Sequence, residues 1–177
     1  KMKHKHLTIY TTTLLITALL SCNSTSTTKQ ETNSSEAALA MVAEGNPEVA
    51  EVTAAPKVPA PVGTRAAKKL IVNLVTTEIE GIIADSIPYT FWTFNNTVPG
   101  SFIRVREGDE VTLNLKNDAS SILPHNIDLH AVTGPGGGAA ATTAPPGKEA
   151  SFSFKAINKG LYVYHCAMPN VSTHNSH

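Results

Sequence analysis

The chain is short of cysteine and has no excess charge of either sign. Its 177 residues include two cysteines, Cys22 in an apolar N-terminal stretch and Cys166 near the C-terminal end. We expect no disulfide between them, which excludes a small disulfide-stabilised scaffold. Lysine plus arginine number 14, as do aspartate plus glutamate, so the formal net charge is zero. Such a balance gives no general attraction for nucleic acid, and we expect no nucleic-acid partner.

Long apolar runs are also scarce, and the clearest one lies close to the N-terminus. Residues 7–20 follow a basic start and lead into the sequence LLSC, which ends at Cys22. The run is long enough for the apolar part of a secretion signal but short for a membrane-spanning helix. Its end resembles the bacterial lipobox, so we predict a signal peptide over residues 1–22 and a lipid anchor on Cys22. The alternative is an ordinary secretory signal with a chance cysteine; both predict export to the periplasm or cell envelope.

Residues 23–68 have few large apolar side chains and are rich in Ser, Thr, Ala, Glu and Pro. This composition offers too little apolar surface to offset the entropy of ordering the chain. We therefore predict a disordered linker over this whole range.

From residue 69 onward the sequence consists of short β-prone runs separated by Gly, Pro and Asn. The runs cover residues 70–75, 89–94, 101–106, 110–116, 151–155 and 161–164. In one of them Val111, Leu113 and Leu115 alternate with polar residues, which is typical of a strand with one buried face. We predict an all-β fold, specifically a Greek-key β-sandwich, over residues 69–177.

The stretch 133–147 is rich in Gly, Ala, Thr and Pro and poor in large side chains. It lacks the G-x-x-x-x-G-K-[ST] pattern of a phosphate-binding loop. The sequence therefore predicts a surface loop here and no nucleotide site.

Histidines are concentrated in the last third of the chain, around its second cysteine. They are His125, His130, His165, His174 and His177. Successive side chains of an extended strand point to opposite faces of a sheet. By this parity His125 faces away from His130, and His165 faces away from its neighbour Cys166.

This parity predicts two clusters of side chains on opposite faces. The members are His125, Cys166 and His174 in the first cluster and His130, His165 and Asp128 in the second. Two histidines and a cysteine are the ligands of blue-copper sites, whereas imidazoles with an open position suit a metal that binds substrate. Zinc also accepts these ligands, but structural zinc sites draw on closely spaced pairs that the sequence lacks. Three interpretations of Asp128 stay open, namely a third metal ligand, a proton donor or a solvent-facing strand residue.

Five sequence motifs lie between residues 70 and 174. They are FWTFNNTVPG at 91–100, FIRVREGD at 102–109, PHNIDLH at 124–130, GPGGGAAA at 134–141 and LYVYHCA at 161–167. Together they resemble the first cupredoxin domain of copper-containing nitrite reductases. The PHNIDLH motif combined with a single His-Cys pair is the most specific part of the match. The resemblance implies a cupredoxin-like fold and the reduction of nitrite to nitric oxide.

The resemblance also implies a role for each candidate side chain. The implied ligands are His125, Cys166 and His174 for type 1 copper, and His130 and His165 for type 2 copper. Nitrite would be reduced at type 2 copper, where Asp128 would hydrogen-bond it and supply a proton. Electrons would enter at type 1 copper and pass through the peptide that joins His165 and Cys166.

Some parts of the family pattern are missing from the sequence. No Gly-Met pair follows His174 to supply the axial methionine of type 1 copper, and Met168 lies too close to Cys166 to replace it. The family also has a second cupredoxin domain, and a neighbouring subunit of a homotrimer supplies the third type 2 histidine. We therefore expect an N-terminal fragment of a longer reductase, inactive by itself and cut short at the end of its domain. The implied electron donor is a small cupredoxin or a c-type cytochrome.

Two other classes of protein compete with this interpretation. A lipid-tethered, single-domain blue-copper electron carrier would explain the first cluster but leaves His130, Asp128 and His165 without a role. A laccase-like oxidase would need paired His-x-His motifs around a trinuclear copper cluster, and none occurs from residue 69 onward.

Overall fold

The computed structural model describes residues 41–133 and 135–168, which are almost entirely β-structure and loops. The elements in chain order are β1 (Glu44–Val49), β2 (Val52–Thr53), β3 (Lys68–Ala84), β4 (Ile87–Phe94), β5 (Phe102–Ile103), β6 (Glu110–Asn117), β7 (Asp128–Leu129), the 3-10 turn η1 (Pro135–Gly138), β8 (Glu149–Lys155) and β9 (Tyr164–His165). No helix within this part of the chain is long and apolar enough to cross a membrane.

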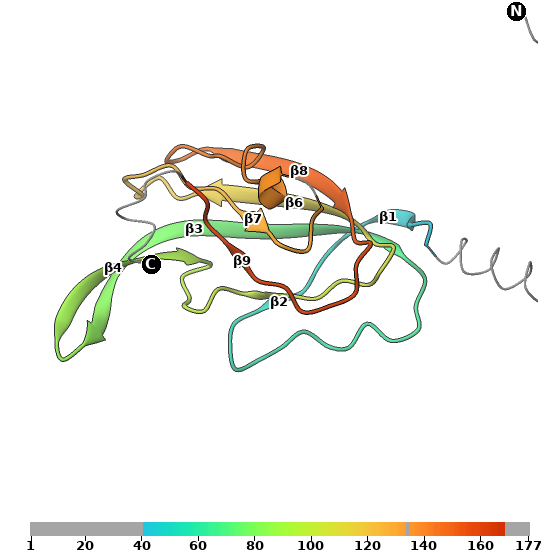
Figure 1. Cartoon of the computed structure of the whole chain (residues 1–177), viewed down its shortest axis with the longest axis horizontal. Helices are drawn as coiled ribbons and strands as arrows, with labels where there is room; N and C mark the ends of the chain where they lie inside the picture. The colour runs from blue at the N-terminus through green and yellow to red at the C-terminus, as the bar shows by residue number, and fades with distance from the viewer. Residues whose placement is uncertain (1–40, 134, 169–177) are drawn as a thin grey trace, which may run out of the picture.

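The main sheet has five strands and is built around the long strand β3 (Figure 1). The first half of β3 pairs in parallel with β1 on one side and β6 on the other. Strand β8 extends the sheet by pairing antiparallel with β6. The second half of β3 leaves these neighbours and pairs with β4, forming a hairpin that projects beyond the sheet (Figure 1).

The core lies on one face of this sheet, as the alternation of apolar residues predicts. Val111, Leu113 and Leu115 of β6 are buried with Val72 and Leu74 of β3. Burial of an aliphatic side chain of this size contributes about 1.5–3 kcal/mol. On the opposite face polar side chains of neighbouring strands bond to one another near solvent. These pairs are Asn114 with Asn73 and Thr112 with Ser153.

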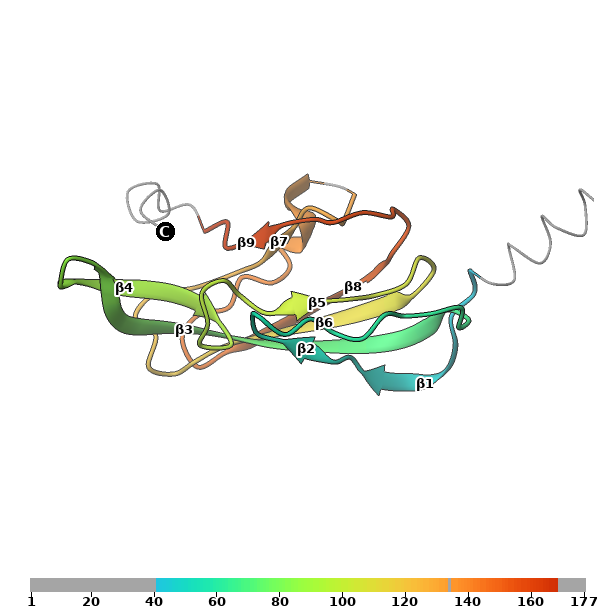
Figure 2. The same ribbon diagram turned by 90° about the horizontal axis from the view of Figure 1, so that it is seen from below.

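Two short ribbons, β2–β5 and β7–β9, form the second layer over the core (Figure 2). Ile127 and Leu129, from the segment that contains β7, are buried against the main sheet. Val52 of β2 and Ile103 of β5 pack on the edge of the same cluster. The predicted all-β sandwich is therefore confirmed, although several predicted strands are shorter. Of the run 161–164, for example, only Tyr164 is in a strand.

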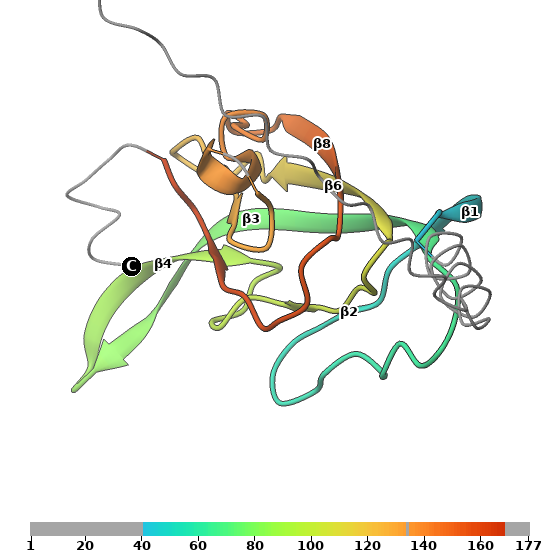
Figure 3. The same cartoon turned by 45° about the vertical axis from the view of Figure 1, so that its right-hand side comes forward.

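The linker prediction is wrong over residues 44–68. Strands β1 and β2 both lie in this range, and the segment between β2 and β3 loops out and returns to the start of β3 (Figure 3). Every residue of β1 is exposed, because β1 is an edge strand held through its backbone. An edge strand of this kind needs little apolar sequence and tolerates Pro47. The predicted signal, Cys22 and the rest of the linker up to residue 40 lie outside the described residues.

A buried ion pair fixes the end of this segment to the domain. Arg65 donates to both carboxylate oxygens of Asp109, at 2.7 and 2.6 Å, and Asp109 is fully buried. The backbone N–H groups of Lys68 and Arg106 bond to the same carboxylate. Burial by itself raises the pKa of Asp109, but these hydrogen bonds and the guanidinium charge outweigh it and hold the pKa below its ordinary value. The tight turn just before Asp109 contains Gly108, whose φ of 95° favours glycine.

Candidate metal centres

The segment 124–130 is held at two points, first by the loop at Ala144 and then by the chain end, and these points place the candidate ligands. His125 exchanges two backbone hydrogen bonds with Ala144. Three residues later, β7 pairs antiparallel with β9, so that Asp128 lies opposite His165. The segment between them carries Asn126 and the buried Ile127. Side chains on one face of this segment therefore lie near His165, and those on the other face lie near Cys166.

The first cluster joins His125 to Cys166. The Nδ1 atom of His125 lies 3.8 Å from the Cys166 Sγ atom, and His125 is only 1% exposed. The Asn126 side-chain oxygen accepts a hydrogen bond of 2.7 Å from the Ala167 N–H and lies 3.6 Å from the Cys166 sulfur. Cys166 forms no disulfide within residues 41–133 and 135–168. His174, the third predicted member, lies outside the described residues.

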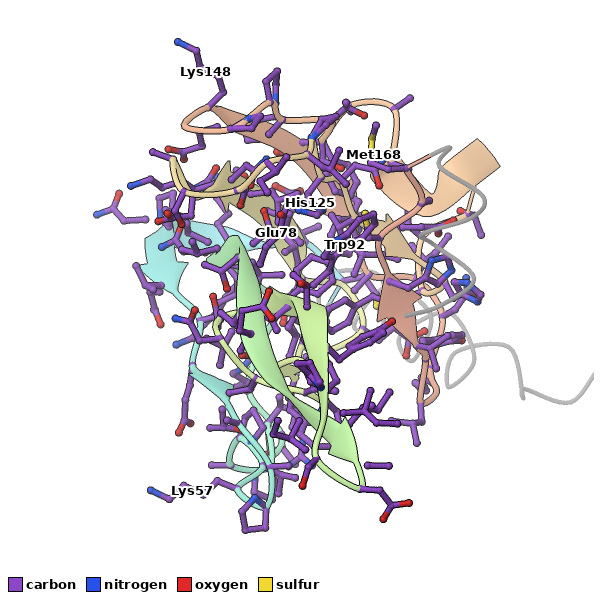
Figure 4. All side chains as sticks on the ribbon, turned by 90° about the vertical axis from the view of Figure 1, so that its left-hand side faces the viewer. Lys57, Glu78, Trp92, His125, Lys148 and Met168 are labelled. Atoms are coloured by element: carbon purple, nitrogen blue, oxygen red, sulfur yellow. The ribbon has the colours of Figure 1, made fainter. Side chains whose placement is uncertain are left out.

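The second nitrogen of the His125 ring is also occupied. Nε2 lies 3.1 Å from the Oε1 atom of Glu78, a residue of β3 whose side chain is 7% exposed. The Trp92 ring of β4 meets the His125 ring edge-on, with the centroids 4.9 Å apart. Figure 4 shows Glu78, Trp92 and His125 gathered beneath the chain end that carries Met168. The β3–β4 hairpin thus contributes directly to the surroundings of the first cluster.

The second cluster contains His130, His165 and Asp128. The Nε2 atoms of the two histidines are 3.0 Å apart, and one ligand atom from each of the three residues lies within 4.8 Å of the others. The other nitrogen of His165, Nδ1, is 3.0 Å from the Cys166 carbonyl oxygen. A carbonyl only accepts hydrogen bonds, so Nδ1 is the donor in this contact, while Nε2 faces His130. His130 is exposed, so this cluster opens to solvent.

The glycine-rich loop closes one side of the second cluster. Gly137 of η1 has φ of 46°, and a Cβ atom there would collide with the Asp128 carboxylate and the Leu129 backbone. The absence of a side chain therefore lets the loop lie directly against β7. The predicted loop at 133–147 is present, and its place beside Asp128 is an additional finding.

Both donor sets have a geometry that a copper ion can use. Nitrogen ligands bind a metal of this size at about 2.0–2.1 Å and thiolates at about 2.3 Å. Two such donors on one ion lie up to about 4 Å apart, which accommodates the 3.0 Å and 3.8 Å separations found here. A cysteine sulfur and an imidazole nitrogen, as in the first cluster, are donors of the kind found in blue-copper sites. An open pocket of about 500 Å³ beside His125 and Cys166, partly lined by Trp92 and Tyr164, leaves room for a further ligand.

The sequence pattern predicts these candidate donors but not Glu78, Asn126 and Trp92, which contact them. Glu78 lies in the run TTEIEG, where nothing distinguishes it from the exposed Glu80 two residues later. Asn126 directly follows the candidate ligand His125, and nothing in the sequence gives it a role of its own. Trp92 had no partner in the sequence that would identify it as a neighbour of His125. Each of these three residues is recognised only through a contact with a residue more than 30 positions away in the chain.

Comparisons with known proteins match this chain to copper proteins. A family model described as multicopper oxidase matches residues 76–176. The copper-containing nitrite reductase of Neisseria meningitidis serogroup B is 48% identical over 125 residues, which cover 71% of this chain and 32% of that protein. A solved copper nitrite reductase from Nitrosomonas europaea has a TM-score of 0.54 and 32% identity, covering 60% of this chain and 38% of that one. The solved multicopper oxidase mgLAC has a TM-score of 0.51 and 31% identity, covering 60% and 35%.

The matched share of each protein limits what is transferred. The chain spans about a third of the length of the meningococcal relative, 32% of it. The resemblance to copper-containing nitrite reductases and the cupredoxin-like fold are both confirmed. With more than half of its residues matched by the family model, the chain belongs to the multicopper oxidase family.

Proposed function

We propose that this domain is part of a copper-containing nitrite reductase that reduces nitrite to nitric oxide. One observation carries the proposal: two donor clusters lie on opposite sides of a single peptide link, with His165 in one and Cys166 in the other. Relatives named copper-containing nitrite reductase support it. A blue-copper electron carrier would use the first cluster alone and would leave His130, Asp128 and His165 without a function.

The two clusters divide the chemistry between them. The proposed ligands are His125, Cys166 and His174 for type 1 copper, and His130 and His165 for type 2 copper. Copper in these sites would supply one-electron transfer at the first and a binding position for nitrite at the second. The peptide between His165 and Cys166 is the shortest covalent path between the clusters, and we assign it the transfer of the electron.

Asp128 is the proposed proton donor. Reduction of one nitrite ion to nitric oxide takes up one electron and two protons and releases one water molecule. The Asp128 carboxylate lies within 4.8 Å of the ring nitrogens of His130 and His165, where a nitrite oxygen would be held. A carboxyl group in this position can hydrogen-bond the anion and pass it a proton, and such general acid catalysis contributes about 10²–10⁴-fold to a rate.

Further ligands have to complete both clusters. Among the described residues the first cluster has one imidazole and one thiolate, and the second has two imidazoles and a carboxylate. We propose that a homotrimer supplies the third type 2 imidazole from a neighbouring subunit, with a second cupredoxin domain present in the working enzyme. A small cupredoxin or c-type cytochrome would donate the electron. A lipid anchor on Cys22 would hold the enzyme in the periplasm or cell envelope.

Nitrite turnover in the full-length gene product tests this function. With a chemical reductant and nitrite, native protein should release nitric oxide. Asp128→Asn should keep the blue absorption and lose about 10²–10⁴-fold in turnover, because a proton donor is removed while both donor sets stay intact. Asp85→Asn, at the exposed tip of the β3–β4 hairpin, is the matched control and should keep full activity. A blue protein with one copper per chain and no nitric oxide release would favour the electron carrier instead.

A further inference from the structure

Glu78 is a buried carboxylate that the proposed reaction does not use. It projects from the second half of β3, and its side chain is 7% exposed. Its Oε1 atom accepts hydrogen bonds from the backbone N–H groups of Ile122 at 3.1 Å and Leu123 at 2.9 Å. The same oxygen lies 3.1 Å from Nε2 of His125. One carboxylate oxygen therefore ties β3 both to the loop before His125 and to its ring.

We propose that Glu78 is a positioning residue that sets the tautomer and orientation of His125 as a metal ligand. An oxygen that already accepts two backbone N–H bonds is an acceptor toward the ring as well, so Nε2 carries the ring hydrogen. The Nδ1 lone pair then points to the side of Cys166, whose sulfur is 3.8 Å away. Histidine ligands of metals commonly donate their second N–H to a carboxylate in this manner. The inference rests on the proposed function only in taking His125 as a copper ligand.

The partner strand supplies a second restraint on the same ring. Glu78 and Trp92 are directly opposite each other in the β3–β4 pairing, so their side chains lie on one face of the hairpin. The Trp92 ring meets the His125 ring at 75° with the centroids 4.9 Å apart. Figure 4 shows the three side chains together. The hydrogen bond fixes rotation of the imidazole, and the aromatic contact limits its tilt.

The carboxylate should also tune the redox behaviour of the site. A hydrogen bond from Nε2–H to a buried negative charge makes the imidazole a stronger donor, which favours the more highly charged copper(II) over copper(I). Loss of such an outer carboxylate typically lowers metal affinity by about 10–100-fold. For a one-electron couple, each tenfold loss that falls on copper(II) alone raises the reduction potential by about 59 mV.

Three variants of the full-length protein separate these effects. Glu78→Gln keeps the shape and an accepting oxygen but removes the charge. Glu78→Ala removes both. Glu80→Gln is the matched control, because Glu80 lies two residues along the same strand, is less buried and bonds to Thr90. Two properties are measured for each variant. The first is the reduction potential of the blue copper. The second is the His125 tautomer, read by NMR in copper-free, ¹⁵N-histidine-labelled protein, with His125→Gln used to assign the signal.

The native protein should show His125 with Nε2 protonated before any copper is added. Glu78→Gln and Glu78→Ala should both lower copper(II) affinity by about 10–100-fold and raise the potential by about 59 mV or more. Glu78→Gln should keep the native tautomer, whereas Glu78→Ala should mix the two tautomers. Glu80→Gln should match native protein in both measurements. A Nδ1-protonated His125 in native protein, or a Glu78→Gln potential equal to that of Glu80→Gln, would overturn the assignment and leave Glu78 as a brace for the loop.

The design also separates this inference from the proposed function. A native protein that binds copper without a blue absorption would contradict the function, and the tautomer in copper-free protein would still decide the role of Glu78. A blue, active protein whose His125 tautomer and copper potential do not change when Glu78 is substituted would contradict the inference alone.

Discussion

Replacing Arg65 with methionine should lower the free energy of unfolding of the domain, because it leaves the buried Asp109 carboxylate without its guanidinium partner. Asp109 is fully buried, and Arg65 donates two of the four hydrogen bonds that its carboxylate accepts. Breaking a buried pair by removing one member costs about 3–5 kcal/mol. The Arg65 side chain is 24% exposed, which allows some water to reach the site. We therefore expect the lower end, about 3 kcal/mol.

Urea denaturation of the copper-free protein, followed by the fluorescence of Trp92, measures this loss. Lys68→Met is the matched control, since Lys68 lies three residues after Arg65 and its substitution removes only an exposed ion pair with Glu48. An exposed pair contributes about 0–1 kcal/mol. The m-values should agree between the variants if only stability has changed.

The pH dependence gives an independent check on the cause. The pKa of Asp109 is lowered in the folded protein, so the pair contributes stability above the ordinary pKa of 3.8 and loses it as pH falls through the lower folded value. The difference between native protein and Arg65→Met should thus be largest near neutral pH and should narrow below pH 3.8. Equal unfolding of Arg65→Met and Lys68→Met at neutral pH would refute the idea that this segment is fixed to the domain through Asp109.

Two further predictions concern the chain end. Cys166→Ala in the full-length protein should abolish the blue absorption, because the thiolate is the source of its charge-transfer band, while copper bound by His130 and His165 remains detectable by metal analysis. Retained blue colour would exclude Cys166 as a ligand. Tyr164 donates a 2.6 Å hydrogen bond to the Ser101 carbonyl, and burial raises its pKa to about 12. The unfolded phenol ionises at the ordinary pKa of 10.0, before the folded one, so the native protein should lose stability as pH rises from 10.0 to about 12. Tyr164→Phe should lack this loss in thermal denaturation. Parallel pH profiles of the two proteins would contradict the prediction.

Local pattern was sufficient to predict the sheet and the division of the donors. The alternation around Leu113 follows from the two-residue period of a strand, which the buried face of β6 confirms. The same period placed His165 and Cys166 on opposite sides, and the structure brings them to His130 and His125 respectively. Such predictions succeed because each depends only on neighbouring residues. The roles of these residues as copper ligands remain predictions.

The features that sequence missed depend on contacts between distant parts of the chain. Arg65 and Asp109 are 44 residues apart, and Glu78 and His125 are 47 apart. An Arg in a polar segment and a Glu in a mixed strand look like ordinary solvated residues until the fold buries their partners. Strand β1 was missed because it is held by backbone hydrogen bonds, which leave no trace in composition. Cys22 and His174 lie outside the described residues, so the lipid anchor and the third type 1 ligand remain predictions.

Copper content and electron paramagnetic resonance of the full-length protein, with and without substitution of His130 by alanine, test the central claim most directly. Two donor clusters on either side of one peptide link predict two copper ions per chain with two distinct signals, one of them from a blue site. His130→Ala should remove the second signal and one equivalent of copper while the blue signal persists. A single copper per native chain, or loss of both signals together in His130→Ala, would contradict the claim of two separate sites.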